Sequence, residues 1–165
     1  MNQTALDVSH LLVRELEGLT REIELFPDDE AVWRTVPGVT NSAGNLALHV
    51  AGNLQYYIGA IFGGTGYVRN RDAEFLRRSG PRTEIVAELD AAIRVVRDVL
   101  PGISQERFDA EFPEPLMGMK LRTGLFLLHL CAHAGFHLGQ AGYLRRTMTA
   151  NATSSGPIPL APLAM

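Results

Sequence analysis

The chain has few of the features that mark exported, membrane-spanning or nucleic-acid-binding proteins. Its single cysteine, Cys131, cannot form a disulfide within the chain, which fits a reducing compartment. The most apolar run, residues 121–144, is broken by Arg122, three histidines and Gln140, so no stretch reaches the roughly 18 apolar residues of a membrane span. A formal charge of −3 provides no positive field for phosphates or anionic lipids. We therefore expect no nucleic-acid or membrane partner.

The first residues also lack the pattern of an export signal. Asp7, Arg14 and Glu15 interrupt the N-terminal segment before any long apolar run develops. Without a visible signal, the sequence predicts a cytoplasmic location.

What the chain does have is helical periodicity. Nearly half of its 165 residues are hydrophobic, enough to bury one core. Apolar residues recur at intervals of three and four in four segments, with Ser42 and Thr83 as predicted N-caps of the second and third. These segments are residues 4–26, 42–62, 83–100 and 123–148. The sequence predicts an all-α protein, a four-helix bundle with long crossover connections.

The connections and the end of the chain have a different composition. Residues 27–41 contain Pro and Gly without a helical period, and residues 65–82 read as an exposed linker with a short helical turn. Residues 104–120 predict an irregular crossover with an extended piece, because they contain two prolines and a glycine. We expect a domain over residues 1–150 and a Pro/Ser/Ala-rich tail over residues 151–165, mobile or draped on a surface.

Three histidines stand four residues apart in the last predicted helix: His129, His133 and His137. Residues four apart are offset by only about 40° around a helix, so His133 and His137 project from one stripe and can reach one ion. His49, in the middle of the second apolar helix, could complete a three-histidine set across the bundle. Imidazoles suit zinc, nickel, iron(II) or copper(II) better than magnesium or calcium.

A structural role for these histidines remains open at this stage. A lone buried histidine is more often a core residue that hydrogen-bonds a backbone carbonyl, and the HxxxH spacing also arises by chance. Burying three imidazoles without shared partners would be costly, however, and the combination favours a metal site.

Four further polar residues are candidates for supporting the ligands or contacting a substrate. His129 lies one turn before His133, Asn53 one turn beyond His49, and Gln140 nearly one turn beyond His137. Arg145 could attract an anionic substrate, although a charge at a solvated helix end explains it equally.

The stretches "NSAGNLALHVAGN" and "HAGFHLGQAGYLRR" resemble the DinB/YfiT-like family of metal-dependent helical bundles. The resemblance extends from the first helix to about Arg146. It implies a four-helix bundle with a divalent ion, often nickel or zinc, held by His49, His133 and His137. It also implies a homodimer, and a possible link to transferases and isomerases that use low-molecular-weight thiols such as bacillithiol or mycothiol.

Three functions compete at this point. The first is a metal-dependent thiol S-transferase, in which a low-molecular-weight thiol reacts with a small-molecule electrophile. The second is a metal-dependent hydrolase, disfavoured because Ala134, Gly135 and Phe136 separate the histidines where HExxH enzymes carry a glutamate. The third is a non-enzymatic, dimeric binding module in which the metal stabilises the fold.

Overall fold

The computed structural model describes residues 2–153 and 160–163. Within these ranges the chain is helical, and two isolated antiparallel bridges, Glu111 to Arg122 and Leu116 to Met119, take the place of strands. The elements are α1 (Gln3–Glu24), a 3-10 turn (Ala31–Trp33), α2 (Ala43–Leu54), a π-helical turn (Gln55–Ala60), α3 (Ile61–Gly63), α4 (Arg71–Leu76), α5 (Arg82–Val99), a 3-10 turn (Leu100–Gly102), α6 (Gln105–Asp109), α7 (Thr123–Thr149) and a 3-10 turn (Ala161–Leu163).

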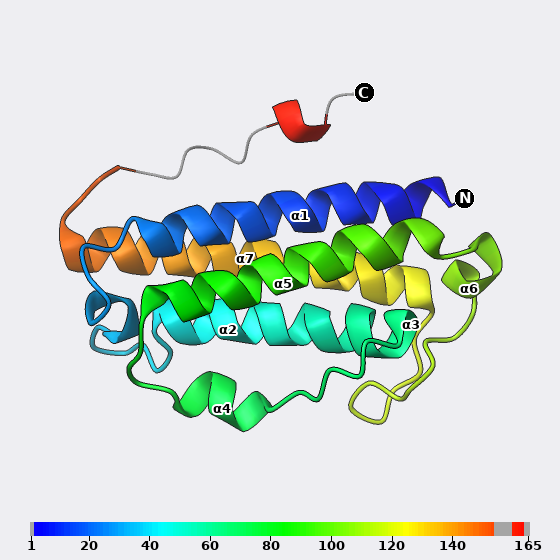
Figure 1. Cartoon of the computed structure of the whole chain (residues 1–165), viewed down its shortest axis with the longest axis horizontal. Helices are drawn as coiled ribbons and strands as arrows, with labels where there is room; N and C mark the ends of the chain where they lie inside the picture. The colour runs from blue at the N-terminus through cyan, green and yellow to red at the C-terminus, as the bar shows by residue number, and fades with distance from the viewer. Residues whose placement is uncertain (1, 154–159, 164–165) are drawn as a thin grey trace.

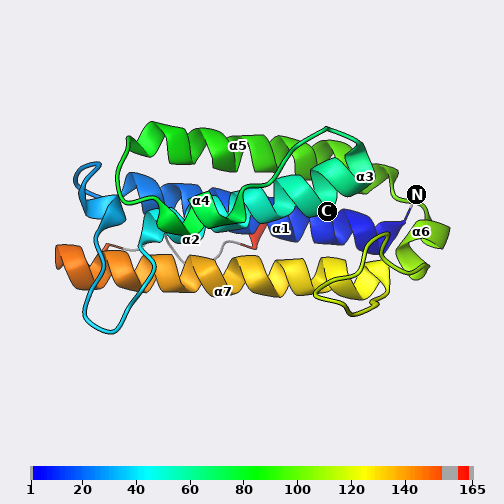
Figure 2. The same ribbon diagram turned by 90° about the horizontal axis from the view of Figure 1, so that it is seen from below.

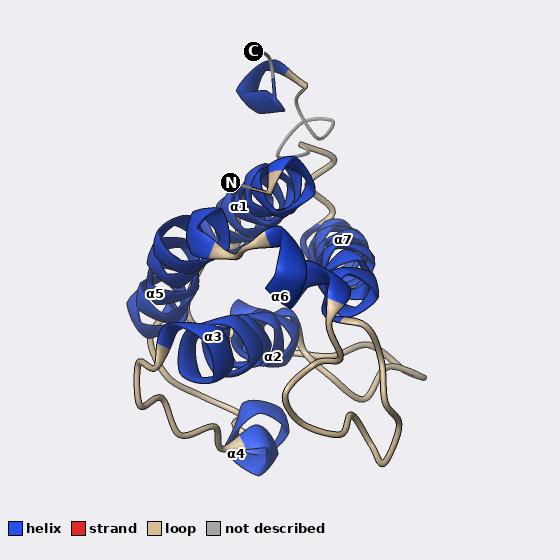
Figure 3. Cartoon of the chain, turned by 90° about the vertical axis from the view of Figure 1, so that its right-hand side faces the viewer, coloured by secondary structure: helices blue, strands red, loops and turns tan. Residues whose placement is uncertain are grey.

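The long helical segments surround one core, as seen from the end of the bundle in Figure 3. Helices α1 and α2 lie on opposite sides, and each packs against both α5 and α7. In Figure 1, α1 and α7 run in one direction, while α2 and α5 run in the other. Because α2 and α7 are antiparallel neighbours, the middle of one helix faces the middle of the other, where the histidines lie. The all-α prediction is confirmed.

The core is built from the apolar stripes that the sequence predicts. Fully buried leucines lie on α1, α5 and α7, and they interdigitate with small and branched residues of α2. Representative core residues are Leu12, Leu16, Val50, Leu89 and Leu127. None of the helices in the described ranges has both the length and the apolar character needed to cross a lipid bilayer.

The helix starts agree with the sequence in one place and differ in another. Ser42 caps α2 as predicted: its hydroxyl accepts the Asn45 N–H, while the Asn45 side chain accepts the Ser42 N–H. The predicted cap at Thr83 is wrong, because α5 already begins at Arg82. Pro81 precedes it without a side-chain cap, and its restricted backbone allows the helix to start directly after it.

Two connections contain short helices, of which the sequence predicted the one in residues 65–82 and missed the one in residues 104–120. The crossover over residues 104–120 begins with α6, which Ser104 caps, and only its later part is extended. The predicted linker over residues 65–82 holds α4, capped by Asn70. In Figure 2, α4 lies across α2 on the outside of the bundle. The description of this segment as an exposed linker is wrong at Glu74, which is buried against α2.

The predicted tail lies largely outside the described residues. Helix α7 ends at Thr149, followed by Ala150 in a left-handed conformation.

Candidate metal centre

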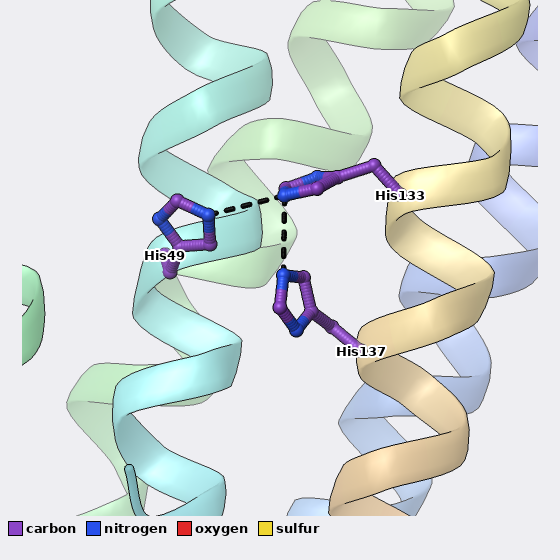
Figure 4. A group of neighbouring side chains, drawn as sticks. All are labelled: His49, His133 and His137. Carbon is purple, nitrogen blue, oxygen red and sulfur yellow. Dashed lines mark hydrogen bonds between the residues drawn. The ribbon is translucent and has the colours of Figure 1, made fainter. Parts of the chain in front are cut away.

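Three histidines converge between α2 and α7. His49 projects from the middle of α2, and His133 and His137 project from successive turns of α7 (Figure 4). The Nε2 atom of His133 lies 3.1 Å from Nε2 of His49 and 3.1 Å from Nε2 of His137. One ligand atom from each residue falls within 4.8 Å of the others, so the group could hold a metal ion. His49 is 7% exposed, and the other two are half-buried.

Helix α4 supplies a carboxylate that fixes the His49 ring. The Nδ1 atom of His49 lies 3.0 Å from Oε2 of Glu74. Arg69 binds the same carboxylate through two hydrogen bonds, from Nε to Oε1 at 2.7 Å and from Nη2 to Oε2 at 2.8 Å. This geometry orients the ring through its distant nitrogen, as carboxylates behind metal-binding histidines commonly do.

The position of Glu74 depends on two residues of α2. Asn45 donates hydrogen bonds from its side-chain amide to the backbone carbonyls of Glu74 and Arg77, which holds the end of α4 on α2. Gly52 leaves the space that the Glu74 side chain fills, because a Cβ atom at this position would lie 2.3 Å from Glu74 Oε1.

The Glu74 carboxylate is held in its ionised form. Burial by itself would raise the pKa of Glu74, but hydrogen bonds from Arg69 and His49 outweigh this effect, and the pKa lies below its usual value. An ionised carboxylate can only accept hydrogen bonds, so its contact with His49 favours the proton on Nδ1 and the lone pair on Nε2, against the donor Nη2 of Arg69, which lies 3.1 Å from the same Nδ1.

Gln140 fixes the tautomer of His137 in the same way. Its side-chain oxygen Oε1 lies 2.8 Å from Nδ1 of His137. An amide oxygen accepts hydrogen bonds, so Nδ1 carries the proton and the Nε2 lone pair faces His133. His49 and His137 therefore both present lone pairs toward the same point.

His133 stays neutral at physiological pH. Burial lowers its pKa from 6.5 to about 3, and repulsion from the neighbouring histidines adds to this effect. Burial also lowers the pKa of His137. Neutral imidazole is the form that binds metal, so the environment keeps these groups ready to act as ligands.

The donor set fits a divalent transition metal. The Nε2 atoms of His49 and His137 both face Nε2 of His133. His133 can donate at most one proton from this nitrogen, so hydrogen bonding can satisfy only one of the two facing lone pairs. A cation accepts lone pairs from all three nitrogens. Imidazole nitrogens favour zinc, nickel, iron(II) or copper(II) over ions that prefer oxygen.

The other predicted site residues occupy different positions. His129 is exposed and stacks on Phe126, with a centroid separation of 6.1 Å; its ring centroid lies 6.0 Å from that of His133. Asn53 is 8% exposed, and its buried Oδ1 has no hydrogen-bond partner among the described residues.

Arg145 is directed away from solvent. It is completely buried; its Nε atom donates to Oε2 of Glu22 at 2.7 Å, and its other nitrogens donate to the carbonyls of Asn151 and Thr153. These contacts join α1, α7 and the residues after α7, so Arg145 holds parts of the fold together.

Sequence reasoning missed Arg69 and Glu74. The only local signal is a charged pair around a short capped turn, "RNRDAEF", and such turns are usually exposed. The burial of Glu74 arises from contact with α2, which lies more than 20 residues earlier in the chain.

Fold and site together define an all-α bundle with a candidate metal centre of three histidines between two antiparallel helices. The family model of the DinB superfamily matches residues 11–141, a range that includes all three histidines, and the chain belongs to this superfamily. A solved structure described as a conserved protein from Enterococcus faecalis has the same fold. It aligns with a TM-score of 0.71 and 18% identity over 92% of this chain and 99% of that chain. The search of curated proteins returns no match.

Proposed function

We propose that His49, His133 and His137 bind one divalent transition metal, nickel or zinc. The observation that carries this proposal is the convergence of three Nε2 atoms, two of them on rings whose Nδ1 atoms contact acceptor oxygens of Glu74 and Gln140. Three histidine ligands leave room for an exogenous ligand, as in sites that act on substrates.

We further propose that the protein is a metal-dependent thiol S-transferase. When bound, the metal would act as a Lewis acid and favour the thiolate form of a low-molecular-weight thiol. The thiolate sulfur forms a bond to an electrophilic carbon of a small molecule, and the leaving group departs with the electron pair of the broken bond. The thiol proton passes to solvent. Glu74 and Gln140 hold the rings of His49 and His137 in place.

The thiol in this proposal comes from outside the chain. Burial raises the pKa of the Cys131 thiol to about 12, so Cys131 stays protonated and is a poor nucleophile. Its sulfur lies 3.9 Å from the carbonyl oxygen of Val8. We place the reaction in the cytoplasm, where small thiols are kept reduced.

Hydrolysis has less support from the geometry. In the described part of the chain, the group that could hold a metal contains histidines alone. The nearby carboxylate of Glu74 is hydrogen-bonded to Arg69 and His49 and is not available to take a proton from water.

Metal analysis tests the first part of the proposal. Protein purified without an affinity tag should contain about one divalent ion per chain, measured by elemental analysis. His49→Ala and His133→Ala should lose it. His10→Ala, which removes an exposed histidine of α1, is the matched control and should retain it. Protein that cannot be loaded with zinc or nickel would contradict the proposal.

A conjugation assay tests the second part. The metal-loaded protein is incubated with a panel of small thiols and electrophiles, and thioether formation is followed by mass spectrometry. We expect product formation that a chelator abolishes and added metal restores. If the loaded protein melts at a higher temperature but forms no thioether with any pair, the metal has a structural role and the protein is a binding module.

We also propose that the chain forms a homodimer through α7. Leu125, Leu128 and Phe136 are 52%, 47% and 61% exposed, and their spacing places them on one side of the helix. Light scattering after size exclusion should give twice the chain mass. Leu128→Glu should shift it toward the monomer, whereas Met117→Glu, at an 89% exposed position outside the helix, should not.

A further inference from the structure

A cavity of about 510 Å³ opens beside His137. It lies between the loop before α2 and the C-terminal half of α7, and its volume falls in the range of roughly 300–1,000 Å³ typical of small-molecule sites. Leu46 of α2 and Leu144 of α7 line it and are almost fully buried, whereas Val39 is 41% exposed. The cavity therefore has a buried apolar floor at Leu46 and Leu144 and is open to solvent at its sides, where Thr40, Gln140, Tyr143 and Thr147 are exposed.

A tight turn shapes one wall. Val39 donates its N–H to the carbonyl of Val36 at 3.0 Å, and Gly38 between them has a φ of +83°. The Pro37-Gly38 pair suits this turn, because proline fixes the first central residue and glycine accepts a positive φ at the second. The wall thus has a defined conformation.

The cavity shares two residues with the metal centre. His137 lines it, and the Nε2 atom of the same ring lies 3.1 Å from Nε2 of His133. Gln140, which fixes the His137 tautomer, also lines it. A molecule in the cavity therefore lies against one of the three proposed ligands.

The lining is neutral. Apart from His137, the polar residues that line the cavity carry hydroxyl or amide groups: Thr40, Asn41, Gln140, Tyr143 and Thr147. No Asp, Glu, Lys or Arg of the described residues is among them. A charged ligand would lose water here without gaining a counter-charge, whereas an apolar body with neutral polar groups would be well matched.

We propose that this cavity binds the electrophilic substrate, and that the substrate is a small, uncharged and largely apolar organic molecule. The identification of the ligand as the substrate rests on the proposed function. The hydroxyl and amide groups would pair with neutral acceptors such as nitro or carbonyl oxygens.

Binding of two matched probes tests the substrate class without any turnover. The probes are 1,3-dinitrobenzene, which is neutral, and 3,5-dinitrobenzoate, which has the same ring and one negative charge. Backbone amide shifts of Thr40, Asn41 and Thr147 are followed by NMR during titration. We expect the neutral probe to shift these amides and to bind at least roughly tenfold more tightly than the anion.

Two variants locate the binding. Thr147→Trp places a bulky ring in the cavity, and Thr4→Trp, at an exposed position of α1, is its control. Thr147→Trp should weaken dinitrobenzene binding at least roughly tenfold, while Thr4→Trp leaves it unchanged. Equal affinity for the two probes, or unchanged affinity in Thr147→Trp, would overturn the proposal.

Metal content, measured on the same samples, separates the two proposals. Normal metal content without dinitrobenzene binding overturns the cavity assignment and leaves the metal site intact. Binding that Thr147→Trp weakens, in a protein that cannot be loaded with metal, supports the cavity as a binding site and overturns the proposed transferase function.

Discussion

The Nδ1 atom of His49 lies 3.0 Å from Oε2 of Glu74, and Arg69 donates hydrogen bonds to both oxygens of the same carboxylate. The interaction joins the middle of α2 to a short helix outside the bundle. It sets the direction of the His49 lone pair and thus prepares one ligand of the metal centre before any metal binds.

Replacing Glu74 by Gln should weaken metal binding. The amide has no negative charge to stabilise the Nδ1 proton, and a loss of roughly 10- to 100-fold in metal affinity is expected. Competition titration with a chromophoric chelator measures the affinity. Glu30→Gln, at a surface ion pair with Arg34, should have no effect; equal affinities in all three proteins would contradict a role for Glu74.

Adding one methyl group at Gly52 should disturb the contact between Glu74 and His49, because the methyl group would occupy space that the Glu74 carboxylate fills. In Gly52→Ala the new Cβ would lie 2.3 Å from Glu74 Oε1, so either the carboxylate or α4 must move. We expect a loss of about 1–3 kcal/mol in the free energy of unfolding, together with weaker metal binding. Gly139→Ala on α7 is the control.

The control should change stability in the opposite direction. Outside the adjoining turns of α7, no heavy atom of the described residues lies within 4 Å of the position that a Cβ at Gly139 would take, and alanine favours the helix over glycine by about 1 kcal/mol. Urea denaturation of both variants checks this. Similar destabilisation in the two would mean that space beside Glu74 is not the cause.

The metal-free protein should lose stability as the pH falls below about 6.5. Burial lowers the pKa of His133 from 6.5 to about 3, so between these values the unfolded chain binds a proton that the folded chain does not. The contribution of His133 to the free energy of unfolding is fully present above pH 6.5, the pKa in the unfolded chain. It is lost as the pH falls toward about 3, the pKa in the folded chain. One such group contributes at most about 1.4 kcal/mol per pH unit, and less here because His133 is partly exposed.

Urea denaturation of chelator-treated protein at pH 7 and pH 5 measures this dependence. His133→Asn should show a smaller difference between the two pH values, while His10→Ala should behave like the parent protein. A parent protein that is equally stable at both values would show that His133 titrates normally.

Replacing Arg145 should affect the fold and not the metal. Its guanidinium is completely buried and forms the shorter ion pair of Glu22, at 2.7 Å, while Arg146 lies 3.8 Å from the other oxygen; Arg145→Ala removes the shorter pair and should cost at most about 3–5 kcal/mol. Metal affinity of the folded fraction should remain unchanged. If binding of an anionic substrate fell while stability did not, Arg145 would contact substrate as the sequence alone allowed.

Local sequence pattern was enough to predict the bundle helices and the three histidines. The apolar periodicity of α1, α2, α5 and α7 reflects one buried face per helix, and a four-residue spacing places His133 and His137 on one side of α7 wherever the helix packs. The capping pair of Ser42 and Asn45 is likewise local, because both partners lie within one helical turn.

The sequence by itself determined the four long helical segments and which of their faces are apolar. The tertiary structure decided what lies behind the ligands: Glu74 and Arg69 reach His49 only because Gly52 leaves space and Asn45 holds the end of α4. It also gave Arg145 a buried partner and formed the cavity between the loop before α2 and α7. Such contacts join residues far apart in the chain, and their energies depend on distances and burial that no local pattern encodes.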